Sequence, residues 1–128
     1  MTAFDDVKEW IDNPESLDVA SKDDVSGLRE QFPRLPDDYL QFLTEVGHGD
    51  LGSLVIYVSP IDPVYVYSEA RARLLKGLVL FGDDMQGFCY GFDLKAGCRV
   101  VEVDPRGRVD RTIEAGFGDF LRSFLKPD

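Results

Sequence analysis

The chain has 128 residues, 44% of them hydrophobic and 12% aromatic, which predicts one globular domain with a single core over residues 1–128. Fourteen basic residues against twenty-four acidic ones give a formal net charge of −10. A surface with this charge repels nucleic-acid phosphates and anionic lipid headgroups, and it attracts cationic partners. We therefore expect no direct binding to nucleic acid or to a membrane.

Neither a targeting segment nor a disulfide framework is predicted. The first ten residues carry three carboxylates and lack the apolar stretch of a signal peptide. The longest apolar runs, such as residues 78–81, are far shorter than the roughly 20 residues that span a membrane. Two cysteines, Cys89 and Cys98, are too few for a disulfide scaffold. The expected compartment is the cytoplasm.

The first third of the chain has helical periodicity. Phe4, Val7 and Ile11 recur at helical spacing, and Asn13-Pro14 ends that pattern. Residues 23–32 predict a weaker second helix, because Gly27 interrupts it.

The clearest predicted helix lies within residues 35–47. Pro36 suits its first turn, where the missing N–H leaves no hydrogen bond unmade, and two aspartates follow at the positive end of the helix dipole. Gly47 is a typical C-terminal stop. The residues that form its apolar stripe are Tyr39, Phe42, Leu43 and Val46.

The rest of the chain predicts antiparallel strands followed by one helix. The expected strands are residues 53–59, a less regular apolar piece at 64–67, and residues 78–81, 88–94, 98–104 and about 108–114. Residues 68–76 predict a short helix or turn, and residues 104–107, Asp-Pro-Arg-Gly, have the composition of a type I turn. An apolar stripe over 117–125 predicts a final helix. This order of helices, strands and helix indicates an α+β fold.

The predicted hairpin of residues 88–104 keeps the two cysteines apart. A three-residue loop at 95–97 places Leu94 opposite Cys98 and Cys89 opposite Val103, which is too great a separation for a disulfide. The same register places Asp93 across from Arg99, a surface pair of small energetic value. We interpret both cysteines as small buried residues and not as nucleophiles.

Acid–base catalysis would depend on His48, the one histidine in the chain. It lies in the loop 47–52, Gly-His-Gly-Asp-Leu-Gly, which matches the string GxGxxG. A dinucleotide site needs that loop between a strand and a following helix, whereas here a helix precedes it and a strand follows. We therefore expect a loop histidine and glycines that permit tight turns. No metal site is expected, since the cysteines lack zinc-ligand spacing, and no cofactor is expected.

Acidic side chains on neighbouring strands leave two further alternatives. Two of Asp83, Asp84, Asp93, Glu102 and Asp104 could converge as a glycosidase-like pair, although a chain this acidic brings carboxylates together by chance. Alternatively, Cys89 and Gly91 form the bottom of a concavity on one face of the strand, and the other face carries exposed aromatic groups. The competing interpretation is that Gly91 only relieves crowding at a bend. The residues that we take as candidate partner-binding residues are Asp83, Asp84, Gln86, Asp93 and Asp104.

Three segments resemble the SUKH superfamily, which includes the yeast cell-wall-assembly regulator and many bacterial immunity proteins. Residues 35–43, Leu-Pro-Asp-Asp-Tyr-Leu-Gln-Phe-Leu, are similar to its Leu-Pro-x-x-Tyr-x-x-Phe-Leu helix. Residues 87–94 resemble its glycine-led strand that ends in apolar-Asp-apolar, and residues 117–121 resemble its final Phe-x-x-Phe-Leu helix. The loop Gly47-His48-Gly49 departs from the Asn-Gly-Gly that is frequent after the family's helix.

The resemblance implies an α+β fold in which N-terminal helices and a C-terminal helix pack on one face of a curved, mostly antiparallel sheet. It also implies a non-catalytic protein-binding domain, of which an immunity protein that neutralises a cognate polymorphic toxin is the leading hypothesis. A regulatory or scaffold protein that binds several partners is the alternative. An enzyme that uses His48 or a carboxylate pair is a third hypothesis.

Overall fold

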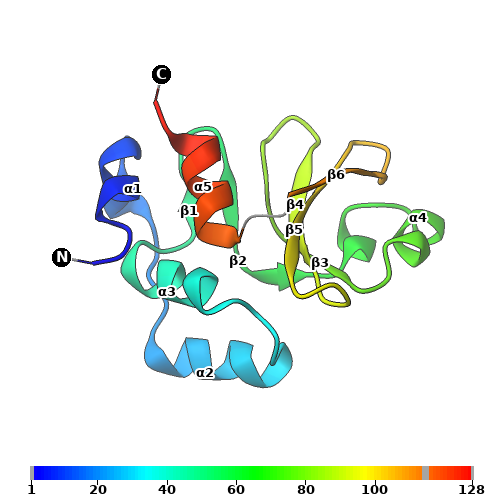
Figure 1. Cartoon of the computed structure of the whole chain (residues 1–128), viewed down its shortest axis with the longest axis horizontal. Helices are drawn as coiled ribbons and strands as arrows, with labels where there is room; N and C mark the ends of the chain where they lie inside the picture. The colour runs from blue at the N-terminus through cyan, green and yellow to red at the C-terminus, as the bar shows by residue number, and fades with distance from the viewer. Residues whose placement is uncertain (1, 114–115, 128) are drawn as a thin grey trace.

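A computed structural model describes residues 2–113 and 116–127 of the chain. Within these residues the chain forms one open, six-stranded antiparallel sheet whose strands follow one another in chain order (Figure 1). The strands are β1 (Gly49–Asp50), β2 (Val55–Ile61), β3 (Leu78–Asp83), β4 (Cys89–Asp93), β5 (Arg99–Val103) and β6 (Val109–Ile113). The α-helices are α1 (Asp5–Trp10), α2 (Lys22–Gln31), α3 (Asp37–Glu45), α4 (Glu69–Leu74) and α5 (Phe117–Leu125). Short 3₁₀ helices occupy η1 (Pro14–Ser16) and η2 (Pro63–Tyr65). The predicted α+β class is confirmed.

The local signals in α3 act as expected. Asp37 and Asp38 lie in its first turn, and the predicted apolar stripe is buried. Pro36 stands one position earlier than predicted, as the N-cap with extended backbone. Gly47, with φ of 108°, ends the segment in the left-handed region that glycine tolerates best. The two ends of α3 therefore lie at the signals in its own sequence, the acidic first turn and Gly47.

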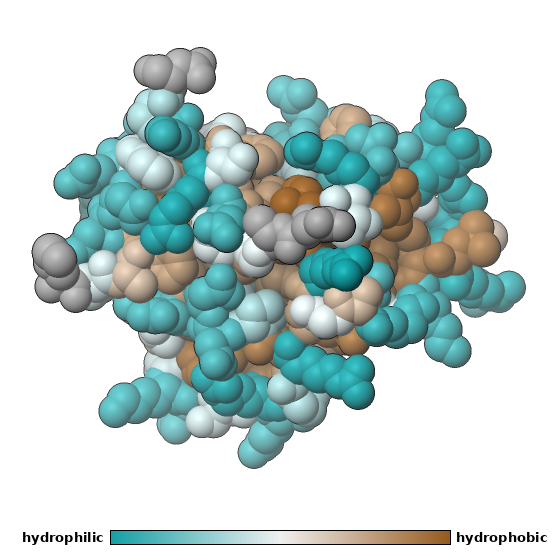
Figure 2. Space-filling model, in the orientation of Figure 1, coloured by the Kyte–Doolittle hydropathy of each residue, from teal (hydrophilic) through white to brown (hydrophobic). Residues whose placement is uncertain are grey.

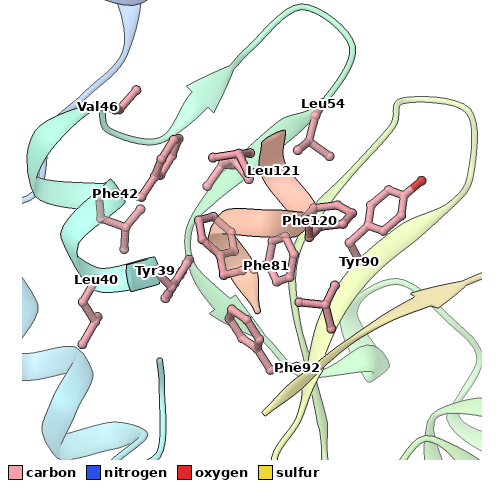
Figure 3. Packing of buried hydrophobic residues seen from close by; sticks show 14 of the residues in the cluster. Tyr39, Leu40, Phe42, Val46, Leu54, Phe81, Tyr90, Phe92, Phe120 and Leu121 are labelled. Atoms are coloured by element: carbon pink, nitrogen blue, oxygen red, sulfur yellow. The ribbon is translucent and has the colours of Figure 1, made fainter. Parts of the chain in front are cut away.

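Helices α1, α2, α3 and α5 contribute side chains to one core against one face of the sheet. Figure 3 shows the part of this core in which α3 and α5 meet the strands. Tyr39 from α3 lies among Phe81, Phe92 and Phe117, with ring centroids 5.1 to 6.2 Å apart. The aromatic face of β4 was predicted to be exposed, and that prediction is wrong. Tyr90 is 3% exposed and Phe92 is fully buried, because α5 covers them. The Tyr90 ring lies 5.0 Å from that of Phe120 on α5.

The connection between β2 and β3, which carries η2 and α4, covers part of the opposite face of the sheet (Figure 1). Its Leu75 joins a second buried cluster with Leu78 and Leu80 from β3, Cys89 from β4, and Val101 and Val103 from β5. Residues 64–67, predicted as an irregular strand piece, form no strand: Val64 and Tyr65 belong to the 3₁₀ helix η2, and a turn follows them. The sheet is therefore packed on both faces, and the concavity predicted above Cys89 and Gly91 is filled.

Gly91 shows why a glycine occupies the middle of β4. A Cβ atom at this position would collide with the carbonyl oxygen of Val79 and lie 3.1 Å from Cδ2 of Leu80. The pairing of β3 with β4 shifts by one residue between Leu80 and Gly82, directly beside this contact. Relief of crowding at a bend, the alternative for Gly91, therefore agrees with the structure.

The predicted hairpin register is confirmed at both ends, since Cys89 pairs with Val103 and Asp93 pairs with Arg99. The connecting loop is longer than expected, because β4 ends at Asp93 and β5 begins at Arg99. At the type I turn, the Gly107 N–H donates to the Asp104 carbonyl at 2.9 Å. The strand predicted over about 108–114 is β6, and Glu114 lies outside the described residues.

Candidate functional site

Four of the five predicted partner-binding residues gather at one end of the sheet. Asp83 ends β3, Asp84 and Gln86 lie in the following turn, and Asp104 opens the turn after β5. These two turns touch, because a Cβ atom on Gly87 would lie 2.9 Å from Cγ of Pro105. We call this surface, residues 83–88 and 104–108, the turn end of the sheet.

The carboxylates of the turn end hold the turns in shape. Asp84 Oδ1 accepts the N–H groups of Gln86 and Phe88 at 2.8 and 3.1 Å. Asp104 Oδ1 accepts those of Arg108 and Arg106 at 3.0 and 2.9 Å, and these bonds hold the pKa of Asp104 below its ordinary value. Such bonds from a side chain to the following backbone are typical of aspartate in turns. Sequence reasoning selected these residues for their charge, whereas the structure gives them a local structural role as well.

Asp93 lies apart from the other four. It ends β4 at the opposite end from Cys89, and its Oδ1 accepts the Lys95 N–H at 3.0 Å. The five candidates therefore do not form one continuous surface.

A half-buried polar cluster that sequence reasoning missed lies behind the turn end. Tyr57 from β2 donates its hydroxyl to Asp83 Oδ2 at 2.6 Å, and Tyr67 donates to the Asp104 carbonyl oxygen at 3.1 Å. Burial raises the pKa of both phenols. The alternation of β4 placed Cys89 on this face, but no pattern in the sequence indicated that the two tyrosines would cover it.

Neither cysteine has the surroundings of a nucleophile. Both are free and buried, and burial raises the pKa of each thiol. Cys98 donates to the Arg34 carbonyl oxygen at 2.8 Å. A nucleophilic cysteine needs a lowered pKa and exposure, so the interpretation of both residues as structural agrees with their positions.

His48 lies beside the segment that leads into α2. Its N–H and C=O pair with those of Asp18 at 3.0 and 3.1 Å, and its Nε2 lies 3.8 Å from Asp18 Oδ2. The glycines on both sides, Gly47 and Gly49, have positive φ, in agreement with a loop of tight turns.

Of the carboxylates that could form a catalytic pair, Asp83, Asp84 and Asp104 lie at the turn end, whereas Glu102 lies on the other face of the sheet. Asp83 pairs with Cys89 and shares its face, while Glu102 pairs with Tyr90 and lies on the helix-covered face. Glu102 is 9% exposed and contacts Arg111 Nε at 3.5 Å. Burial, with the neighbouring Asp110 carboxyl, raises the pKa of Glu102.

Within residues 2–113 and 116–127, no group of three or more His, Cys, Asp or Glu side chains is arranged to hold a metal ion.

An exposed apolar surface lies at the end of the molecule that carries α4. Hydrophobic residues reach the surface on the right of Figure 2, over this end. The exposed fractions are 47% for Val64, 78% for Tyr65, 45% for Val66 and 72% for Leu74. No helix among the described residues is long and apolar enough to cross a membrane.

The fold and its motifs define an α+β protein of the SUKH type, with a doubly covered meander sheet and the Leu-Pro-x-x-Tyr-x-x-Phe-Leu helix against it. The family model described as SMI1/KNR4 family (SUKH-1) matches residues 19–123, so the chain belongs to this family. The match includes all three segments on which the resemblance was based. A search of curated proteins finds no match to the chain.

Proposed function

We propose that the chain is a non-catalytic protein-binding domain and, specifically, an immunity protein that neutralises a cognate toxin by direct binding. The observation that carries this proposal is the family match over residues 19–123, because the superfamily includes many bacterial immunity proteins. The surroundings of the candidate catalytic groups support the non-catalytic part. Both thiols are buried with raised pKa, and the carboxylates of Asp84 and Asp104 accept backbone N–H groups of their own turns.

The charge of −10 supports a basic partner, such as a toxin domain that acts on nucleic acid. Electrostatic complementarity accelerates the encounter of two proteins and suppresses incorrect partners. The binding rate is then expected to fall as salt concentration rises, because exposed charges are screened. The complex would persist at high salt if its core is apolar.

The test is co-expression of this chain with the toxin domain encoded by the adjacent gene. We expect relief of growth arrest and a complex that co-elutes in size-exclusion chromatography. The matched control is a toxin domain from an unrelated system. Absence of both rescue and complex would rule out the immunity function.

A regulatory or scaffold role is the second candidate. The matching family is described by the name SMI1/KNR4 and not by an immunity function. Affinity purification from the native host that returns several unrelated partners, with no toxin gene beside the chain's own gene, would favour this role over the first.

A further inference from the structure

Nearly all of the net charge belongs to the first 50 residues. This segment has thirteen acidic and four basic residues, a formal charge of −9, whereas residues 51–128 have eleven acidic and ten basic residues. The first segment contains α1, α2 and α3. At the turn end, by contrast, Arg106 and Arg108 lie beside Asp104. The surface that attracts a cation is therefore the one formed by the N-terminal helices.

A groove of about 400 Å³ lies on this acidic side, between α2 and β2. Asp23 and Asp24 line it from α2, and none of the described residues that line it is a lysine or arginine. Val19 and Val58 also line it and are 60% and 67% exposed. Isolated exposed valines are ordinary, but two in one acidic groove combine apolar contact with charge, which is typical of a protein-docking surface.

The β2 side of the groove is an open strand edge. β1 pairs with β2 only at Val55 and Ile56, so residues 57–61 have no strand partner on their outer side within the described part of the chain. Pro60 lies in this stretch, and proline is tolerated in a sheet mainly on edge strands. An unpaired edge accommodates an added extended segment.

The α2 side is open because of Gly27. A Cβ atom there would meet no atom within 4 Å, so glycine is not required by packing at this position. Glycine in a helix interior weakens the helix, and its replacement is therefore compatible with folding. A larger side chain at position 27 is therefore expected to fill the groove without unfolding the protein.

We propose that a basic, extended segment of the partner protein docks in this groove, along β2 and against α2. Its cationic side chains face Asp23 and Asp24, and its apolar side chains contact Val19 and Val58. A second copy of this chain does not suit the groove, because two chains that each carry a net charge of −10 repel each other. The docking site deepens the proposed function and rests on it for the identity of the partner.

The test is an NMR titration of the ¹⁵N-labelled chain with a short peptide that alternates lysine and valine. We expect salt-sensitive shifts at α2, Val19, His48 and Val58, and no such shifts with a peptide that alternates glutamate and valine. Gly27→Arg, which adds bulk and positive charge, should weaken binding at least about tenfold. Gly27→Ala tests the backbone effect alone, and Val109→Arg adds the same charge on β6; both should bind within about twofold of the original chain.

The groove is overturned if the lysine peptide shifts the turn end or the exposed surface at α4 in place of the groove, or shifts no residue. The proposed docking site is also wrong if the Gly27→Arg variant binds the lysine peptide as tightly as the original chain does. It is likewise wrong if the original chain sediments as a dimer and the Gly27→Arg variant as a monomer, because a second copy would then occupy the groove. These outcomes are separate from the co-expression result. If the toxin complex still forms with the Gly27→Arg variant, the docking site is wrong and the immunity function stands. If the lysine peptide binds in the groove but the toxin is not neutralised, the docking site stands and the immunity function is wrong.

Discussion

Asp38 in the first turn of α3 caps a different helix, because its Oδ2 accepts the Gly118 N–H of α5 at 2.9 Å. The N-cap residue of α5 is Gly116, which has no side chain to serve this role. A Cβ atom on Gly118 would lie 3.2 Å from that same oxygen. The beginnings of the two helices are thus joined by one carboxylate, and this bond connects residues 80 apart in the sequence.

Asp38→Ala is expected to lower the free energy of unfolding by about 1 kcal/mol, because α5 loses the acceptor for an N-terminal N–H group. Asp38→Asn keeps an acceptor and should lose less. Asp37→Ala is the control: Asp37 is exposed, and its ion pair with Arg29 should contribute at most about 0.5 kcal/mol. Urea denaturation measures all three variants. Equal losses for Asp37→Ala and Asp38→Ala would refute the capping role.

Tyr39→Phe is expected to leave the fold intact and to raise the free energy of unfolding by about 1 kcal/mol. The Tyr39 side chain is fully buried, and its hydroxyl has no hydrogen-bond partner among the described residues. Removal of an unsatisfied buried hydroxyl ends its desolvation cost, while the ring contacts with Phe92 and Phe117 remain. Thermal and urea unfolding check this. A clear loss of stability would mean that the hydroxyl has a partner, such as a buried water.

The sequence predicted those features whose signals are local. In α3 the acidic first turn, the apolar stripe and the glycine stop all lie within one segment. The pairing of Asp93 with Arg99 followed from the turn between two strands. The Asp38–Gly118 bond could not be predicted in this way, because neither residue's own segment indicates its partner.

The prediction that the aromatic face of β4 is exposed failed for a related reason. Tyr90 and Phe92 form one apolar stripe, and Phe117, Phe120 and Phe124 belong to another, but amphipathic patterns do not specify which stripe covers which. For the candidate site, the structure places Asp83, Asp84, Gln86 and Asp104 at one end of the sheet, and their role in partner binding stays a prediction. The groove between α2 and β2 depends on packing between distant segments, so no single stretch of sequence shows it.

Glu102→Gln is expected to stabilise the protein at neutral pH by on the order of 1 kcal/mol, because ionised Glu102 is buried beside Asp110. The raised pKa means that the folded state binds this proton more tightly than the unfolded state. Stability due to protonated Glu102 is therefore present below its ordinary pKa of 4.5 and is lost as the pH rises through the folded-state pKa.

The stability difference between Glu102→Gln and the original chain should accordingly grow as the pH rises from 4 to 7. Asp110→Asn should also reduce the pH dependence, since it removes the neighbouring carboxyl that raises the pKa of Glu102. Urea denaturation across this pH range gives the difference curve. A difference that is constant with pH would show that Glu102 has no raised pKa in the folded protein.

Cys89 is expected to react with a thiol reagent at pH 8 only when the protein unfolds, because the thiol is 3% exposed and burial raises its pKa. A Cys98→Ser background leaves Cys89 as the one thiol. Tyr57→Phe removes the hydrogen bond to Asp83 and should cost about 1 kcal/mol, which corresponds to a roughly fivefold larger unfolded population and faster labelling. Tyr65→Phe is the control, because Tyr65 is 78% exposed. If Cys89 is labelled at the rate of a free thiol and Tyr57→Phe does not change this rate, then Tyr57 and Tyr67 do not cover Cys89 in the folded protein.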